Sequence, residues 1–226
     1  MERLTIEQKV LRKNDDYAAE NRARFAARGL YVVNIWSAPG AGKTTLLEKT
    51  LGPLGERFRV GVIEGDIQTS IDADRIRRAG APAFQINTNR CHLEAAMIQD
   101  ALAEFPCDAL DLLVIENIGN MVCPAGYDLG EDLRVMVFSV AEGAEKPKKY
   151  PKMFHRSDAV VLNKIDLAPY TDVSVEELER NVRDVSPHAA VFPVSCRSGA
   201  GLEAWVEWLA ARIQSKGETH VSGDTR

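Results

Sequence analysis

The chain opens with a stretch in which apolar side chains are spaced one helical turn apart. Residues 5–28 are otherwise polar and end at Gly29, a common helix stop. The apolar positions at helical spacing are Ile6, Val10, Tyr17 and Phe25. This pattern predicts an amphipathic helix, and we expect residues 1–29 to pack as an N-terminal helix on the domain that follows.

From Tyr31 onwards, short β-rich runs alternate with helical patterns. The seven expected strands are YVVNIW, RVGVIEGD, AFQINT, DLLVIEN, LRVMVFSVA, DAVVLNK and AVFPVS. The helical patterns are Thr44 to Leu54, His92 to Phe105, Ser174 to Val185 and Leu202 to Ile213. The alternation predicts an α/β domain over residues 30–214, with a mostly parallel seven-stranded sheet flanked by helices. Residues 215–226 are polar, and we expect them to form a disordered tail.

Composition narrows the class of protein. At 226 residues and 45% apolar content, one α/β domain of ordinary size is expected. The 33 acidic and 28 basic side chains create no basic field, so we expect neither nucleic acid nor an anionic membrane as a partner. No apolar run approaches the roughly 20 residues that span a bilayer, and the N-terminus lacks a hydrophobic signal region. These features predict a cytoplasmic protein.

A phosphate-binding loop is predicted at residues 37–45. The sequence SAPGAGKTT follows an expected strand and leads into an expected helix, which is the context of a P-loop. Ser37 stands where the pattern usually has glycine, and a small residue still fits. Lys43 is expected on the β- and γ-phosphates, and the Thr44 hydroxyl on Mg²⁺. The expected phosphate-binding residues are Pro39, Gly40, Ala41, Gly42, Lys43, Thr44 and Thr45.

A guanine-reading motif is predicted at Asn163-Lys164-Ile165-Asp166, where the strand DAVVLNK ends. The Asp166 carboxylate can accept from both N1–H and the exocyclic amine of guanine. Two charge-assisted hydrogen bonds of roughly 1.5–3 kcal/mol each favour guanine by about a hundred- to ten-thousand-fold. A second base loop is expected at Ser195 and Cys196, where backbone N–H groups approach the guanine carbonyl and the Cys196 side chain packs in the interior.

Two further strand ends carry acidic residues that should lie beside the P-loop, because ligands gather at the carboxyl ends of parallel strands. Asp66 is expected to orient the attacking water or to hold the Mg²⁺ shell. Glu116 is expected as a Mg²⁺-associated carboxylate, and the Gly119 N–H as a sensor of the γ-phosphate. An acidic residue at a strand end is often only solvated, so this alternative stays open for both carboxylates.

Cys91, His92 and Cys123 are candidate soft metal ligands. The pair lies at the start of a predicted helix, whose positive end favours the thiolate, and Cys123 follows Gly119 by four residues. Three ligands are one short of a closed tetrahedral site, so water, another side chain or a second subunit would complete it. From these residues alone, a buried cysteine beside a surface histidine is the default interpretation. Cys107 precedes a buried strand and is expected in the core.

Several longer segments resemble the HypB family, the GTPases that assist nickel insertion into [NiFe]-hydrogenase. They are IENIGNMVCPAGYDLGE, EGDIQTSIDADR, NRCH and AEGAEKPKKYPKMF. The resemblance runs from about Leu11 to about Trp208 and is most specific around Cys123. It implies that Cys91, His92 and Cys123 bind Ni²⁺ or Zn²⁺ near a nucleotide-dependent homodimer interface. A HypA-type nickel chaperone and the hydrogenase large subunit precursor are the implied partners.

Differences between this sequence and related proteins set further expectations. Family members can carry a Cys-rich nickel motif or a His-rich stretch near the N-terminus, and this sequence has neither. The ATPase branch of the same wider class has an additional P-loop lysine at the position of Ala38. A related urease GTPase should show Cys-Pro-His, whereas this chain has Cys-Pro-Ala. A metal-binding module that holds nucleotide without hydrolysing it is the alternative from another class.

Together these features predict a Mg²⁺-dependent GTPase that assists nickel insertion. GTP and Mg²⁺ are expected to order the segments around Asp66 and Gly119 and to favour the homodimer. The short link from Gly119 to Cys123 is expected to couple nucleotide state to metal affinity, so that hydrolysis of GTP to GDP loosens the metal.

Overall fold

A seven-stranded parallel sheet forms the centre of the protein, as the alternating pattern predicted. The computed structural model describes residues 5–66, 71–105 and 107–223. The strand order is β3-β2-β4-β1-β5-β6-β7, and every pair is parallel. The strands are β1 (Tyr31–Ser37), β2 (Val60–Asp66), β3 (Ala83–Asn87), β4 (Leu112–Glu116), β5 (Leu133–Ser139), β6 (Ala159–Asn163) and β7 (Ala190–Pro193).

Helices connect these strands and cover both faces of the sheet. The α-helices are α1 (Ile6–Ala27), α2 (Lys43–Gly55), α3 (Ile71–Arg78), α4 (Ala95–Glu104), α5 (Lys146–Lys149), α6 (Pro151–His155), α7 (Val175–Val185) and α8 (Leu202–Gly223). Short 3₁₀ turns are η1 (Pro124–Gly126), η2 (Val140–Glu142) and η3 (Ile165–Tyr170). No helix in these ranges is long and apolar enough to cross a bilayer.

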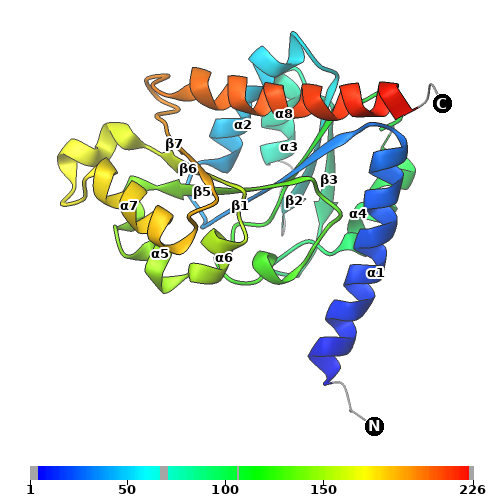
Figure 1. The fold of residues 1–226 in the computed structure, drawn as a ribbon, viewed down its shortest axis with the longest axis horizontal. Coiled ribbons are helices and arrows are strands. Elements are labelled where there is room, and N and C mark those ends of the chain that lie inside the picture. Colours follow the sequence, from blue (N-terminus) through cyan, green and yellow to red (C-terminus); the bar gives the residue numbers. More distant parts are fainter. Residues whose placement is uncertain (1–4, 67–70, 106, 224–226) are drawn as a thin grey trace.

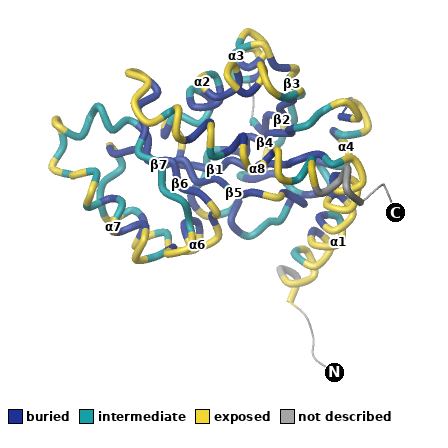
Figure 2. The backbone as a smooth tube through the Cα atoms, turned by 45° about the horizontal axis from the view of Figure 1, so that its top comes forward, coloured by how far each residue is buried: buried dark blue, intermediate teal, exposed yellow. Residues whose placement is uncertain are grey.

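The helices form two layers around the sheet (Figure 1). On one face, α2, α3 and α8 bury Leu47, Ile76 and Trp205 against the strands. On the other face, α1 and α4 cover one half of the sheet, and α6 and α7 cover the other half. The central strands are buried throughout, as Figure 2 shows, and this leaves polar groups at the strand ends as the natural place for a ligand site.

The buried face of α1 differs from the predicted apolar stripe. Val10 is exposed, and the residues that face the protein are Asn14, Ala18, Asn21 and Phe25. These four positions follow helical spacing and share Phe25 with the predicted stripe, so the period was correct and the buried face is rotated relative to the predicted one. Asparagines are buried here because their amides bond to backbone groups of neighbouring segments.

Helix α8 continues where a disordered tail was expected. Its described part extends to Gly223 instead of ending near Gln214. Lys216 explains why the chain stays helical past the apolar stripe, since its ammonium donates to the Leu30 carbonyl and to both oxygens of Asp132. This correction concerns residues 215–223, and the last three residues lie outside the described part.

Two helices in the middle of the chain also differ from the prediction. Helix α4 begins at Ala95, so Cys91 and His92 lie in the preceding loop and not in its first turn. Helix α3 was not predicted because it is short and mostly charged. It is held in place by Arg75, whose guanidinium bonds to both carboxylate oxygens of Glu48 on α2.

Candidate functional site

The loop after β1 has the conformation of a phosphate cradle. Gly40 and Gly42 both have positive φ angles, 76° and 100°, which glycine adopts without strain. A Cβ atom on Gly42 would lie 2.5 Å from Asn163 Nδ2, so no side chain fits at this position. Because α2 begins at Lys43, the first backbone N–H groups of the helix point into the same loop. The loop therefore offers several donors to a phosphate chain.

Lys43 and Thr44 lie at the base of this loop, in contact with the end of β4. Thr44 Oγ1 donates to Glu116 Oε1 at 2.8 Å. Lys43 Nζ lies 3.8 Å from the same carboxylate and donates to Ser37 Oγ at 3.2 Å. Ser37, the departure from the usual glycine, thus holds the lysine in the loop. Lys43, Thr44 and Glu116, which the sequence assigned to the phosphates and Mg²⁺, therefore lie in contact at the base of the loop.

A cleft of about 530 Å³ opens beside the loop, and two carboxyl groups lie at its base. Burial, followed by the neighbouring Glu116, raises the pKa of Glu64 from 4.5 to about 11. Glu64 Oε1 and Glu116 Oε2 are buried and have no hydrogen-bond partner. Two close carboxyl groups with free oxygens, beside the Thr44 hydroxyl, fit a hard divalent cation such as Mg²⁺.

Glu64 was missed as a site residue. The motif Glu64-Gly65-Asp66 offered two acidic residues, and the one at the end of the strand was chosen. Asp66 does line the cleft, but Glu64 is the one that is buried beside Glu116, because the two residues are direct neighbours in the pairing of β2 with β4. The register of β2 against β4, which the sequence pattern does not give, is what identifies Glu64 as a site residue.

Gly119 follows β4 and lies against the phosphate loop. A Cβ atom at this position would be 3.2 Å from Pro39 Cα, a contact with backbone that cannot move aside easily. The glycine also lines the cleft with Asp66. The expected γ-phosphate sensor is therefore located beside the expected phosphate site.

The motif at the end of β6 is bonded directly to the phosphate loop. Asn163 Nδ2 donates to the Ala41 carbonyl at 3.0 Å, and Lys164 Nζ donates to the Gly40 carbonyl at 2.7 Å. Lys164 has a positive φ of 61°, which turns its side chain back over the loop. The two motifs that the sequence placed more than a hundred residues apart form one continuous surface.

A second cavity, of about 280 Å³, continues from the cleft at this motif and is lined by Asp166 and Cys196. Ser195 Oγ donates to Asp166 Oδ1 at 2.6 Å and holds the carboxylate at the rim. The Ser195 N–H is already bonded to the Ala200 carbonyl, so it is not free to approach the guanine carbonyl as was expected. Cys196 is buried, in agreement with a packing role for its side chain. Its N–H donates to Asn163 Oδ1 at 3.4 Å, so the second amide expected at the base also has a partner within the protein.

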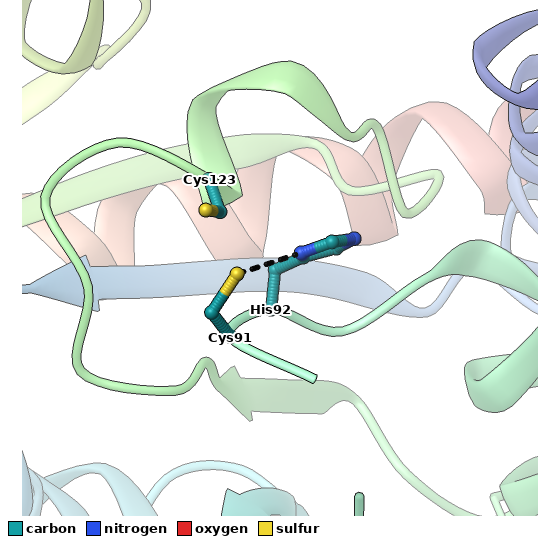
Figure 3. A group of neighbouring side chains, drawn as sticks. All are labelled: Cys91, His92 and Cys123. Atoms are coloured by element: carbon teal, nitrogen blue, oxygen red, sulfur yellow. Dashed lines mark hydrogen bonds between the residues drawn. The ribbon is translucent and has the colours of Figure 1, made fainter. Parts of the chain in front are cut away.

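The candidate metal ligands come together from two separate segments (Figure 3). One donor atom each of Cys91, His92 and Cys123 lies within 4.8 Å of the others. Cys91 and His92 precede α4, and Cys123 precedes η1. Cys107, by contrast, is buried in the core, where burial raises the pKa of its thiol to about 11. The three ligands predicted from the sequence, and not the core cysteine, form the cluster.

The surroundings of His92 indicate which ring nitrogen faces the thiols. Nδ1 lies 3.6 Å from Cys91 Sγ, while Nε2 lies 3.5 Å from Glu94 Oε1 on the other side. The Tyr127 ring stacks on the imidazole at a centroid distance of 3.8 Å. Burial lowers the pKa of His92, which favours the neutral form that binds metals. The adjacent Cys91 thiol raises the pKa of Cys123, as expected when two thiols meet without a cation between them.

Comparison with known proteins agrees with this geometry. The family model described as CobW/HypB/UreG, nucleotide-binding domain, matches residues 31–193. The hydrogenase maturation factor HypB of Azotobacter vinelandii is 53% identical over 207 residues, which cover 91% of this chain and 68% of that protein. The chain belongs to the HypB family. HypB of Escherichia coli K12 is 50% identical over 207 residues, covering 91% of this chain and 71% of its own length.

Solved HypB structures have the same fold. The crystal structure of HypB from Archaeoglobus fulgidus superposes with a TM-score of 0.83 at 37% identity and covers 89% of this chain and 98% of that one. HypB from Helicobacter pylori, crystallised in complex with nickel, gives a TM-score of 0.83 at 40% identity, covering 92% and 97%. This HypB-family chain is therefore a nucleotide-binding P-loop protein of the hydrogenase maturation factors.

Proposed function

We propose that this chain binds and hydrolyses GTP with Mg²⁺ and uses the state of the nucleotide to control the binding of Ni²⁺ at Cys91, His92 and Cys123. In this role it delivers nickel to [NiFe]-hydrogenase in the cytoplasm. Zn²⁺ is a second metal that the same ligand set can take, because thiolate and imidazole suit both ions. The supporting relative is the Helicobacter pylori HypB crystallised with nickel.

One observation carries the proposal. The candidate γ-phosphate sensor, Gly119, and the candidate metal ligand, Cys123, lie on the same loop after β4. Gly119 lies against Pro39 of the phosphate loop, and Cys123 lies against Cys91 and His92. A movement of this loop in response to a γ-phosphate would therefore also move one of the metal ligands.

The nucleotide chemistry is assigned to residues at the strand ends. Lys43 and the P-loop amides bind the phosphates, and Thr44 with Glu116 and Glu64 or Asp66 holds the cation. Mg²⁺, when bound, neutralises charge on the β- and γ-phosphate oxygens. Asp66 orients the attacking water. Asp166, held by Ser195, accepts from guanine and selects GTP over ATP.

A homodimer is proposed because the cluster found among the described residues offers three ligands and not four. Three ligands leave a tetrahedral or square-planar ion with an open position, which a second copy can fill. Val122, next to Cys123, is 62% exposed, and an apolar side chain in that position suits an interface between copies. A HypA-type chaperone and the hydrogenase large subunit precursor are the proposed nickel donor and acceptor.

The coupling is tested by measuring Ni²⁺ affinity in competition with a chromophoric chelator. The protein is loaded with Mg²⁺ and either GDP or a non-hydrolysable GTP analogue, and sedimentation is recorded in both states. We expect affinities that differ by about fivefold or more, and a dimer that is favoured by the GTP analogue. Equal affinities together with an unchanged monomer would reject the coupling.

Hydrolysis itself is tested by phosphate release. Lys43→Ala removes the charge that contacts the phosphates, and we expect turnover to fall by about 10²- to 10³-fold. Lys49→Ala on the exposed side of the same helix is the matched control and should leave turnover unchanged. Phosphate release that is absent in the wild type, or independent of Lys43, would favour the non-hydrolysing metal-binding module.

A further inference from the structure

A buried asparagine lies between the nucleotide cleft and the metal cluster. Asn117 directly follows Glu116 at the end of β4 and is 1% exposed. Its side-chain Oδ1 accepts from the Leu93 N–H at 3.1 Å and from the Ile118 N–H at 2.9 Å. Leu93 follows His92 in the sequence, and Ile118 precedes Gly119. One amide group thus bonds the backbone of the ligand-bearing loop and the backbone of the phosphate-sensing loop.

The same amide reaches the segment beyond Cys123 through two further buried groups. Asn117 Nδ2 donates to Asn34 Oδ1 at 3.3 Å, and Asn34 Nδ2 donates to Glu131 Oε1 at 3.3 Å. Glu131 Oε2 then accepts from the Leu129 N–H at 2.7 Å. The network therefore joins Leu93, directly after His92, to Leu129, which follows Cys123 along the chain.

Replacing Asn117 with an apolar residue would lower the free energy of unfolding. Leu93 lies in the loop before α4, where no strand or helix partner takes its N–H. A buried donor left without an acceptor costs free energy, so the Asn117 oxygen fixes where the loop can lie. The position of the loop that carries Cys91 and His92 consequently depends on the position of the end of β4.

The end of β4 responds in turn to what occupies the cleft. Glu116 accepts from Thr44 and lies near Lys43, and Gly119 touches Pro39 on the other side of Asn117. A nucleotide and cation that engaged these groups would pull on Glu116, directly before Asn117, and on Gly119, two residues after it. Asn117, hydrogen-bonded to both loops, would transmit such a displacement. Close-packed interiors shift between discrete arrangements and do not deform gradually.

We propose that Asn117 is a positioning residue that couples the nucleotide to the metal site, by setting where Cys91 and His92 lie relative to Cys123. This inference rests on the proposed function and adds a second route to the one along the loop from Gly119 to Cys123. The first route moves Cys123, and the route through Asn117 moves the opposite pair of ligands.

The decisive measurement compares Ni²⁺ affinity with GDP and with the non-hydrolysable GTP analogue, both with Mg²⁺, in the full chain. Where the wild type shows a ratio of about fivefold or more, Asn117→Ala should reduce it to within about twofold while GDP affinity is kept. Asn181→Ala is the matched control, because Asn181 is also buried and donates to a backbone carbonyl, Ala144 O, away from both sites. Its ratio should equal that of the wild type.

A second measurement needs no substitution and covers the case in which Asn117→Ala fails to fold. Hydrogen exchange of the Leu93 amide is followed in the wild type with each nucleotide, and its protection should differ between the two states. An unchanged affinity ratio in Asn117→Ala, or equal Leu93 protection in both states, would overturn the role of Asn117. Equal Ni²⁺ affinities in the wild type would overturn the proposed coupling itself, which is a separate result.

Discussion

The nucleotide cleft and the metal cluster lie at the same edge of the sheet, yet they are built differently. The cleft is formed by contiguous motifs at the ends of β1, β4 and β6, which bond directly to one another, as Asn163 does to Ala41. The cluster is formed by two loops whose backbone is held from outside, by Asn14, Asn21 and Asn117. The cleft is therefore held by direct bonds among its own motifs, whereas the cluster is held by residues outside it.

This difference gives the two sites different freedom to move. Residues in the P-loop are fixed by the start of a helix and by glycine conformations that no other residue adopts easily. The loops that carry the candidate metal ligands are held by a few side-chain amides, and each buried group left without its partner costs about 1–3 kcal/mol. A site of the second kind suits a cargo that must be released, because ligand positions can change without unfolding the domain.

The largest expected effect concerns base selection in the cleft. Asp166→Asn replaces an acceptor-only carboxylate with an amide, so GTP binding should weaken by about a hundred- to ten-thousand-fold while binding of xanthosine triphosphate improves. Nucleotide competition with a fluorescent analogue measures both. An unchanged preference would remove Asp166 from the base site and would weaken the contrast between a rigid cleft and a movable cluster.

The next effect is on the metal cluster alone. Cys123→Ser removes a thiolate, and Ni²⁺ affinity should fall by at least about a hundredfold, since even residues that only support ligands contribute about 10- to 100-fold. GDP affinity should stay the same. Cys107→Ala is the matched control, because this cysteine is buried in the core and lies outside the cluster. Retained nickel binding in Cys123→Ser would show that the cluster is not the nickel site.

A smaller effect should distinguish a buried asparagine that supports the metal cluster from one that lies elsewhere. Asn21 donates to the carbonyls of Ala95 and Leu129, which follow the two ligand-bearing segments. Asn21→Ala should lower the free energy of unfolding by about 2–3 kcal/mol and Ni²⁺ affinity by about tenfold, with GDP affinity unchanged. Asn181→Ala, measured by the same chelator competition and urea titration, should lose stability without losing nickel affinity. Equal nickel losses in both variants would contradict the distinction.

The last test concerns the pH dependence of stability at the cation site. The pKa of Glu64 is raised from 4.5 to about 11, so the folded state keeps this proton while the unfolded chain loses it. Without Mg²⁺ or nucleotide, the stabilising contribution of the buried, neutral Glu64 is fully present below about pH 4.5 and is lost as pH rises towards 11, by up to about 1.4 kcal/mol per pH unit.

Glu64→Gln should remove this slope because an amide stays neutral throughout. Urea unfolding in chelator at about pH 6 and about pH 8 measures it, and Glu207→Gln, on an exposed residue, should keep the slope of the wild type. A slope in Glu64→Gln that matches the wild type would mean that another group titrates. Addition of Mg²⁺ and GDP should flatten the slope of the wild type and not that of the variant.

Sequence reasoning was most successful where a property is local. The P-loop, the Asn163 to Asp166 motif and all seven strands follow from residues close together in the chain, because hydrophobic periodicity and glycine placement act over a few positions. It was less successful for α1, where Phe25 is buried as predicted but Asn14 and Asn21, and not Val10, complete the buried face. It also passed over Glu64, whose importance comes from its neighbour across the sheet.

By itself, the sequence determined the parallel α/β fold, the phosphate loop and the set of candidate soft ligands, since each depends on residue type and short spacing. Only the tertiary structure decided that Cys91 and His92 meet Cys123, and that Glu64 lies beside Glu116. Only the tertiary structure, too, decided that Asn117 bonds Leu93. The reason is physical: strand order and helix packing set which loops meet, and those depend on burial summed over the whole chain.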